Sequence, residues 1–359
     1  MTLSRSPYME WAKLRAKPRI DLAGSNLLAC GLDDLPGARE AVDVAGESPN
    51  GYRPLVEAIA ARYGVRPENV ATAVGCSGAN FLALAALVES GDDVLFEQPG
   101  YDPLAGAATM LGARVTRFDR RFEEGWRLDP DRIARALTPA TRVVILSSPH
   151  NPSGVLASAD DLAEIGRLAE RHGFTVVVDE VYLDLAAGGH PPAATLSPAF
   201  ISTNSLTKAY GLASLRCGWA LASPEVTEKI RRARDVVDVW SPMPADRLSV
   251  VAFEDLGRLA ERARRIVESN APLVSSFLAA REELECVPSQ ATIAFPRFAD
   301  GRDAGPFVER LFREHGVAVV PGSFFDKPSH FRISFGGATE PLREGLEAIA
   351  AVLDGLRTG

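Results

Sequence analysis

Short apolar runs rich in β-branched residues alternate with helical patterns over the first half of the chain. The runs predict strands at residues 69–74, 94–96, 114–118, 142–146 and 175–178. After the first run, apolar side chains recur at the spacing of one helical face, at Phe81, Leu84, Leu87 and Val88. A strand, a helix and a further strand in succession favour parallel neighbours joined by right-handed crossovers. The pattern therefore predicts an α/β sheet with helices packed on its faces.

The ends of one predicted helix are marked by its own residues. Ser158 precedes the helical pattern and Asp161 follows three positions later, as in a capping box. Gly173 stands where the pattern stops, and glycine is a common residue just after a helix C-terminus. We therefore expect a helix between Ser158 and Gly173, directly before the last of these strands.

The pattern changes after about residue 250. Residues 252–280 form a long, charged helical stretch that would lead out of the first domain. Shorter mixed elements follow, with strands expected at 292–295, 317–320 and 331–335 and helices at 306–315 and 340–356. We predict a large domain at residues 51–250 and a smaller α/β domain that combines residues 1–50 with residues 251–359.

Composition and charge narrow the class of protein. The 359 residues are 46% hydrophobic and 24% charged, as in soluble globular chains. The net charge of −8 comes without a stripe of Lys and Arg, which argues against nucleic acid or an anionic membrane as a partner. No apolar run has transmembrane or signal-peptide length, so we expect a cytoplasmic protein. The four cysteines are widely separated and there is no His cluster, so we expect neither a disulfide framework nor a metal site.

One short segment combines an amine, a hydroxyl and a guanidinium. Lys208 is flanked by small and apolar residues, and desolvation of a lysine favours the neutral, nucleophilic amine. Ser205 precedes it, and Arg216 follows eight positions later, with the fork geometry that suits a phosphate. The alternatives are a surface lysine and an arginine in a structural ion pair whose stem packs on Trp219.

A second segment has the features of a phosphate cradle. Residues 76–80, Cys-Ser-Gly-Ala-Asn, lie where a predicted strand passes into a helix, so backbone N–H groups and the positive end of the helix dipole converge there. Ser77 would add a hydroxyl donor and Gly78 would let the backbone approach a ligand. Taken alone, the segment is more typical of a plain turn with a helix cap than of a phosphate site.

Polar residues also follow two buried strands. Asp179 ends the run 175–178, and ligand sites of open α/β sheets lie at the C-terminal ends of strands. There it could pair with a protonated pyridine nitrogen, or it could be an ordinary helix N-cap. Tyr182 and Asn151 could donate to a phenolic oxygen of the same ring, although Asn151 also fits an Asn-Pro turn.

Seven blocks occur in the order known from one enzyme family: GYRPLVEAIA, GCSGAN, PGYDPL, SSPHNPSG, VVVDEVY, SLTKAYGLASLRCGW and FRISFG. From about residue 51 to residue 335 the chain resembles the fold-type-I pyridoxal-phosphate enzymes of the class I/II aminotransferase family. The resemblance implies a large domain with a mixed, mostly parallel seven-stranded sheet between helices, plus a smaller α/β domain. It also implies pyridoxal 5'-phosphate as the cofactor.

The resemblance assigns roles residue by residue. It implies Lys208 as the Schiff-base lysine and proton shuttle, Asp179 as the partner of the pyridine nitrogen, and Tyr101 as the aromatic residue that stacks on the ring. Asn151 and Tyr182 would donate to the 3-oxygen. The phosphate would be held by Ser77, Gly78, Ala79, Ser205 and Arg216.

Two further residues carry implications for partners. Arg332 matches the arginine that binds the α-carboxylate of the substrate, which implies an α-amino acid. Tyr52 resembles the tyrosine that reaches the phosphate of the neighbouring subunit's cofactor, which implies a homodimer with active sites at the interface.

The chain departs from the family pattern near its N-terminus. The family's usual Gly-Glu-Pro type of opening is replaced by Gly24, Ser25 and Asn26, which we expect to lie above the substrate and to influence its choice. A second arginine that would bind a distal acid has no clear match, so aspartate is not favoured as the substrate.

The resulting hypothesis is a pyridoxal-phosphate-dependent aminotransferase that acts on an α-amino acid and a 2-oxo acid. Another reaction of the same cofactor is the main alternative: a β- or γ-lyase, a decarboxylase, a cyclase or an oxidase. A cofactor-binding regulatory module without turnover is the alternative from a different class. The presence of every expected site residue argues against that module.

Overall fold

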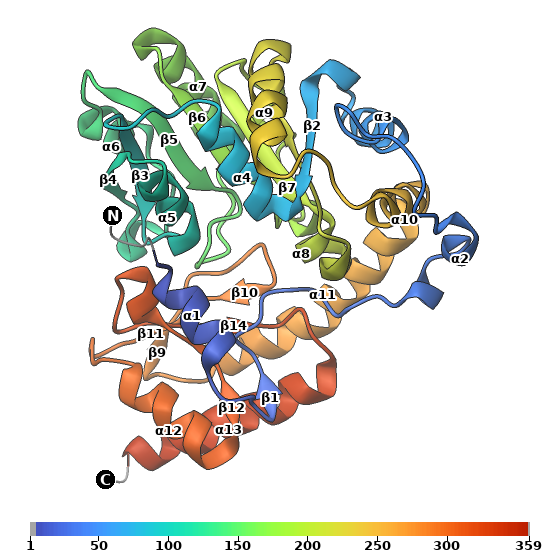
Figure 1. Ribbon diagram of the computed structural model, residues 1–359. Helices are drawn as coiled ribbons and strands as arrows, with labels where there is room; N and C mark the ends of the chain where they lie inside the picture. Colours follow the sequence, from blue (N-terminus) through green and yellow to red (C-terminus); the bar gives the residue numbers. More distant parts are fainter. Residues whose placement is uncertain (1–4, 358–359) are drawn as a thin grey trace.

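A seven-stranded sheet forms the centre of the larger part of the molecule (Figure 1). The computed structural model describes residues 5–357. The sheet has the order β2-β8-β7-β6-β5-β3-β4, and only β8 runs antiparallel to its neighbours. Its strands are β2 (Val70–Val74), β3 (Asp93–Gln98), β4 (Arg114–Asp119), β5 (Thr141–Ser147), β6 (Thr175–Asp179), β7 (Phe200–Ser205) and β8 (Cys217–Leu221). The predicted mixed, mostly parallel sheet is confirmed.

Helices cover both faces of this sheet, which explains why the middle residues of β5 and β6 are apolar on both faces. In β5, Val143 and Ile145 face one hydrophobic cluster, and Val144 and Leu146 face another. The first cluster contains α4 (Gly75–Ala85), α5 (Asp102–Met110) and α9 (Pro224–Val237). The second contains α6 (Pro130–Ala136) and α7 (Ala159–His172). A third, around Trp219, contains α3 (Arg53–Tyr63), α8 (Leu206–Tyr210) and α10 (Met243–Glu254).

The smaller part packs three helices on short strands and has its own apolar core (Figure 1). The helices are α11 (Leu256–Ala279), α12 (Gly305–His315) and α13 (Thr339–Arg357). The strands are β1 (Ile20–Asp21), β9 (Leu284–Glu285), β10 (Ile293–Ala294), β11 (Arg297–Phe298), β12 (Val317–Ala318), β13 (Val320–Pro321) and β14 (Phe331–Ser334). β1 pairs with β12, β14 lies between β10 and β13, and β9 pairs with β11.

The N-terminal segment contacts both parts of the molecule. Helix α1 (Pro7–Leu14) lies between them in Figure 1, and the Ser6 hydroxyl before it donates to Asp102 of α5 at 2.7 Å. Strand β1 belongs to the small sheet. Leu35 and Ala38, the latter in α2 (Ala38–Ala41), instead pack with α3 and α10. The N-terminal residues are therefore shared between the two cores, and the domain boundaries at 50 and 250 stay a prediction.

Most predicted elements are present, and the differences have local causes. Ser158 accepts a hydrogen bond from the Asp161 backbone at 3.0 Å and Gly173 adopts the left-handed conformation, as predicted for the two ends of α7. The stretch 252–280, expected as one helix, is divided at Asp255 between α10 and α11, because Asp255 leaves the helical region with φ −113° and ψ 21°. The strand expected at 317–320 is divided as well, since β12 pairs with β1 and β13 with β14.

Membrane-spanning helices and metal sites are two kinds of feature that the sequence had not indicated. Among residues 5–357, no helix is long and apolar enough to cross a membrane. Within the same described range, no group of three or more His, Cys, Asp or Glu side chains is arranged to hold a metal ion.

Candidate active site

A cavity of about 510 Å³ lies at the C-terminal edge of the central strands. Ser147, Asp179 and Ser205, which end β5, β6 and β7, contribute to its wall. Ten of the residues predicted for the site line it: Ser25, Asn26, Ser77, Tyr101, Asn151, Asp179, Tyr182, Ser205, Lys208 and Arg216. The strand order brings together most of these side chains, and the N-terminal segment adds Ser25 and Asn26 from nearly two hundred residues before Arg216.

Lys208 presents its amine to the N-terminal segment. It lies in α8, which begins after Ser205, whose hydroxyl accepts from the Thr207 backbone at 3.3 Å. The Nζ atom donates to Ser25 Oγ at 2.9 Å and to Asn26 Oδ1 at 2.8 Å. Burial, assisted by the charge of Arg332, lowers the pKa of Lys208 to about 8. A substantial fraction of this amine is therefore neutral near physiological pH, as a nucleophile requires.

Asp179 is a buried acid surrounded by hydrogen-bond donors. Its carboxylate accepts from Asn80 Nδ2 at 2.8 Å and from the Val181 backbone at 3.2 Å. Burial raises the pKa of Asp179, and the bonds from Asn80 and Val181 oppose this rise. The side chain can therefore serve as a fixed acceptor at the base of the cavity.

Arg332 lies directly behind Asn151. It is fully buried on β14 and donates to Asn151 Oδ1 at 2.7 Å, to the Tyr8 hydroxyl at 2.8 Å and to the Ala23 carbonyl at 3.1 Å. The bond to Asn151 uses that residue's only side-chain acceptor, which leaves its NH₂ group to donate to a ligand. The Asn151 backbone in turn donates to Ser147 Oγ at 3.0 Å.

The start of α4 and the loop before β8 form the basic end of the cavity. Arg216 has a left-handed backbone with φ 50°, and its carbonyl accepts from the Gly75 backbone at 2.7 Å. A Cβ at Gly75 would overlap the Arg216 guanidinium, and one at Gly218 would overlap the Gly75 backbone. The two segments therefore approach as closely as glycine allows, which holds Arg216 beside Ser77 at the helix N-terminus.

Two of the hydroxyls in this wall have no partner. The Tyr182 and Thr207 hydroxyls are buried and make no hydrogen bond to any described residue. Unpaired buried polar groups are costly, so such groups around a cavity indicate a polar ligand. Together with an amine, a buried acid and an arginine at a helix N-terminus, they suit a phosphorylated pyridine aldehyde.

Residues 40–349 match the model of the family described as aminotransferase class I and II. The chain belongs to this family. It is 34% identical to the capreomycidine synthase of Streptomyces vinaceus over 98% of this chain and 94% of that protein. It is 30% identical to the aspartate/prephenate aminotransferase of Thermus thermophilus, over 85% of this chain and 82% of that one.

The fold agrees with this membership. A pyridoxal-phosphate-dependent aminotransferase from Streptococcus suis superposes with a TM-score of 0.93 at 26% identity, covering 99% of this chain and 98% of that one. A tetra mutant of the aspartate aminotransferase of Thermus thermophilus gives a TM-score of 0.85 at 27% identity, with 94% of this chain and 97% of that chain covered. The chain is thus an enzyme of the aminotransferase family with the fold-type-I architecture.

Some predicted site residues of this aminotransferase do not line the cavity. Gly78 and Ala79 lie behind Ser77 in α4, and a Cβ at Gly78 would make only ordinary contacts with the protein. Gly24 lines a neighbouring cavity of about 220 Å³ that shares only Asn26 with the first. Tyr52 precedes α3, half-buried, with the Arg247 guanidinium 5.7 Å from its ring centroid.

Helix α1 supplies residues of the candidate site that the sequence did not reveal. Met9 and Lys13 line the cavity, Tyr8 bonds to Arg332, and the Tyr101 hydroxyl donates to Met9 Sδ at 3.5 Å. Ser6 followed by proline is a helix-start signal that could have predicted α1 itself. No local signal in the sequence shows that this helix reaches the cavity.

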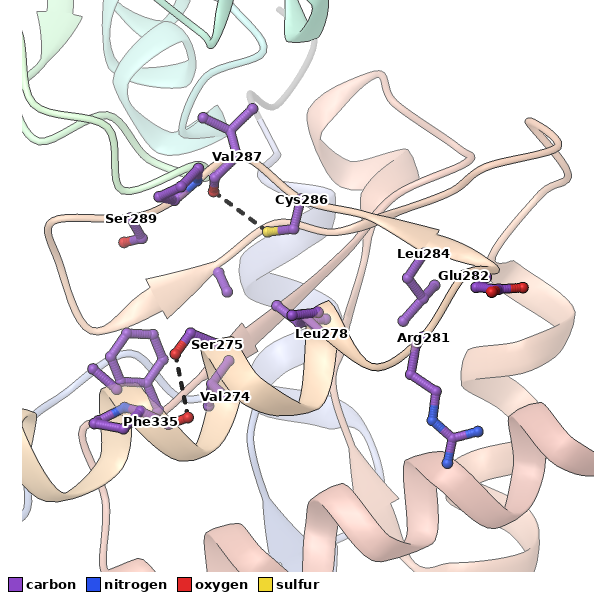
Figure 2. A pocket seen from close by; sticks show the side chains of 15 residues that line it. Val274, Ser275, Leu278, Arg281, Glu282, Leu284, Cys286, Val287, Ser289 and Phe335 are labelled. Carbon is purple, nitrogen blue, oxygen red and sulfur yellow. Dashed lines mark hydrogen bonds between the residues drawn. The ribbon is translucent and has the colours of Figure 1, made fainter.

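A larger cavity of about 830 Å³ lies in the small part of this aminotransferase, away from Lys208 (Figure 2). It is formed by Val274, Ser275 and Leu278 of α11 opposite Cys286 and Val287. Its lining is mainly apolar and shares no residue with the cavity around Lys208. Volume alone does not mark the site of chemistry; the converging amine, acid and unpaired hydroxyls do.

Proposed function

We propose that this protein binds pyridoxal 5'-phosphate at Lys208 and moves the amino group of an α-amino acid to a 2-oxo acid. The observation that carries the proposal is the Lys208 amine, whose pKa is lowered to about 8 in the same cavity as the buried Asp179. An amine of this kind can combine with an aldehyde, and a buried carboxylate can hold a protonated pyridine nitrogen.

The donor set fits each part of the cofactor. Asp179 would hold the ring nitrogen, Asn151 and Tyr182 the 3-oxygen, and the Tyr101 ring would lie against the pyridine ring. The phosphate would be held by the Ser77, Ser205 and Arg216 side chains and the backbone N–H groups of Gly78 and Ala79. When bound, the cofactor supplies the electron sink that chemistry at Cα needs.

The protein's own residues would bind the substrate and move its proton. Arg332, fixed by Asn151 and Tyr8, would attract the α-carboxylate, and it keeps Nε as a buried donor without a partner. The neutral Lys208 amine would take the Cα proton and return it. General acid–base transfer of this kind contributes roughly 10²–10⁴-fold to a rate.

The N-terminal segment would select the substrate. Ser25 and Asn26 bond to the reacting amine, and Met9 and Lys13 cover the cavity from α1. Gly24 would act through the path of this segment, since its own atoms line the neighbouring cavity.

The proposed assembly is a homodimer in which Tyr52 serves the partner's cofactor. Tyr52 lies outside its own chain's cavity. Exposed apolar side chains flank the start of α10, near Tyr52: Val42, Val44, Val236, Val237, Val239 and Trp240. Arg247 of α10 connects the segment of Val42 and Val44 to this helix, because it donates to the Ala45 carbonyl at 3.0 Å, and its guanidinium lies 5.7 Å from the Tyr52 ring centroid. Exposed apolar groups of this kind are typical of interfaces between subunits.

One relative supports a second candidate function. The capreomycidine synthase is similar over nearly the whole chain, and its name is not that of an aminotransferase. A different reaction of the same cofactor on an amino acid, such as a cyclisation or an elimination, is therefore the second candidate.

Nitrogen transfer distinguishes the two candidates. The cofactor-loaded protein is incubated with single ¹⁵N-labelled amino acids and a mixture of 2-oxo acids, and the products are analysed by mass spectrometry. We expect ¹⁵N in a new amino acid, with loss of at least about 10³-fold in rate for Lys208→Ala. Lys229→Ala, an exposed lysine paired with Glu225 on α9, is the control and should keep full activity.

The other outcomes each have a meaning. Consumption of an amino acid without transfer of ¹⁵N would replace transamination by the second candidate. Cofactor binding without turnover of any amino acid would instead support a regulatory module.

A further inference from the structure

Asn80 is a buried polar residue at the base of the cavity with no part in the steps above. Asp179 and Thr203 are paired in register on the adjacent parallel strands β6 and β7, so their side chains lie on the same face of the sheet. Asn80 reaches both from α4. Its Nδ2 lies 2.8 Å from Asp179 Oδ2, and its Oδ1 lies 2.5 Å from Thr203 Oγ1.

The chemistry of the neighbours fixes the orientation of the Asn80 amide. An ionised carboxylate can only accept hydrogen bonds, so the NH₂ end of Asn80 must face Asp179. The carbonyl end then faces Thr203, whose hydroxyl must donate to it. A flipped amide would place two acceptors together at Asp179. Thr203 therefore acts as a lock that keeps the Asn80 donor on the carboxylate.

Four neighbours of the Asp179 carboxylate favour its charged form, whereas its burial favours the neutral form. Asn80, the Val181 backbone and the Cys76 thiol bond to it, and the Lys208 charge attracts it. The structure gives this carboxylate two hydrogen bonds from nitrogen donors, and only the one from Asn80 comes from a side chain. Without the Asn80 donor, the effect of burial would raise the pKa of Asp179 further. The acid would then tend toward its neutral form, which cannot stabilise a protonated ring nitrogen.

We propose that Asn80, locked by Thr203, is a positioning residue that holds the Asp179 carboxylate ionised and aligned for the ring nitrogen of the cofactor. The inference rests on the proposed function, because it needs a pyridine nitrogen beside Asp179. Asn80 itself would not touch the substrate. Its effect would pass through Asp179 alone.

Binding of two cofactors separates this role from a general structural one. The second cofactor is 1-deazapyridoxal 5'-phosphate, in which C–H replaces the ring nitrogen and cannot bond to Asp179. We measure the dissociation constants of both compounds for the cofactor-free protein by absorbance and fluorescence titration. The ratio of the two dissociation constants isolates the contribution of the ring nitrogen to cofactor binding.

We expect the unsubstituted protein to prefer pyridoxal phosphate and Asn80→Leu to reduce that preference by about tenfold, since a hydrogen bond to a charged group is at stake. Thr203→Val, which removes the lock without changing the size of the side chain much, should reduce it in the same direction. Thr203→Ser keeps the hydroxyl and should retain the preference. Asp179→Ala should abolish it.

Asn270→Leu is the matched control for loss of a buried asparagine. Asn270 bonds to the Phe335 and Gly337 carbonyls in the small part, so its replacement should lower stability without changing the ratio. If Asn80→Leu does not fold, the comparison of Thr203→Val with Thr203→Ser tests the proposal instead. An unchanged ratio in Asn80→Leu or Thr203→Val, with both compounds weakened equally, would overturn the proposal and leave the proposed function intact. An unsubstituted protein that binds neither compound would instead overturn the proposed function.

Discussion

At the scale of single residues, the position of the Lys208 proton is decided by competing neighbours. Burial and Arg332 favour the neutral amine, Asp179 favours the ammonium, and Ser25 and Asn26 accept hydrogen bonds from it. The first two effects prevail, and the pKa falls to about 8 from the ordinary 10.5.

This shift predicts how capture of the cofactor depends on pH. Only the neutral amine attacks an aldehyde, so the capture rate of the cofactor-free protein should rise with pH and level off above a midpoint near 8. Stopped-flow absorbance between about pH 6 and 10 measures this rate. Nα-acetyl-lysine in the same buffers corrects for titration of the cofactor itself. A corrected rate that still climbs steadily at the upper limit would show an unperturbed lysine.

The sequence predicted the residues that lie in distinctive local contexts, and it missed those whose role arises from long-range contact. Lys208, Asp179 and Asn151 follow strands or stand in apolar surroundings, and all three line one cavity. Tyr8 bonds to Arg332 across 324 positions, and its neighbours in the sequence are those of any surface helix. Asn80 looked like part of a phosphate loop because nothing local indicates that a strand pair lies beneath it.

At the scale of elements, the contact between the start of α4 and the start of β8 shapes the basic end of the site. Gly75 and Gly218 meet there without room for a Cβ at either position. Periodicity cannot reveal close approach of this kind: the sequence pattern predicted β2 and α4, and it did not predict β8. The same holds for the small sheet, where two-residue strands such as β12 and β13 are defined by their partners.

Because the two segments approach so closely, adding one methyl group at Gly218 should destabilise the protein strongly. Gly218→Ala should lower the free energy of unfolding by about 2–3 kcal/mol, because backbone rather than a flexible side chain would have to move. It should also weaken cofactor binding through the displaced Arg216. Thermal and urea unfolding measure the first effect, and cofactor titration the second.

Gly106→Ala provides the control for this substitution. Gly106 lies inside α5 with open space around its Cβ position, so alanine there should raise stability by up to about 1 kcal/mol. Equal effects of the two substitutions would contradict the packing argument.

At the scale of the whole molecule, the exposed apolar side chains beside α10 predict a dimer. Sedimentation velocity of the cofactor-loaded protein should show a species of twice the chain mass of 38.4 kDa. Trp240→Glu should shift it toward the monomer, because a charge in an apolar interface loses its solvation. Met110→Glu, which alters an exposed apolar residue of α5, should leave the mass unchanged. A monomer for the unsubstituted protein at micromolar concentration would contradict the interface and the role of Tyr52 across it.

The meeting of Tyr8, Asn151 and Arg332 has a consequence for the order in which the enzyme is made. These residues come from the beginning, the middle and the far end of the chain. During synthesis Lys208, Asp179 and Arg216 all emerge from the ribosome before Arg332. The residues proposed to hold the cofactor are thus synthesised well before the residue proposed to bind the substrate's carboxylate. On the proposed roles, a nascent chain that captured the cofactor before Arg332 was synthesised would be unable to orient an amino acid, and turnover would have to wait for β14.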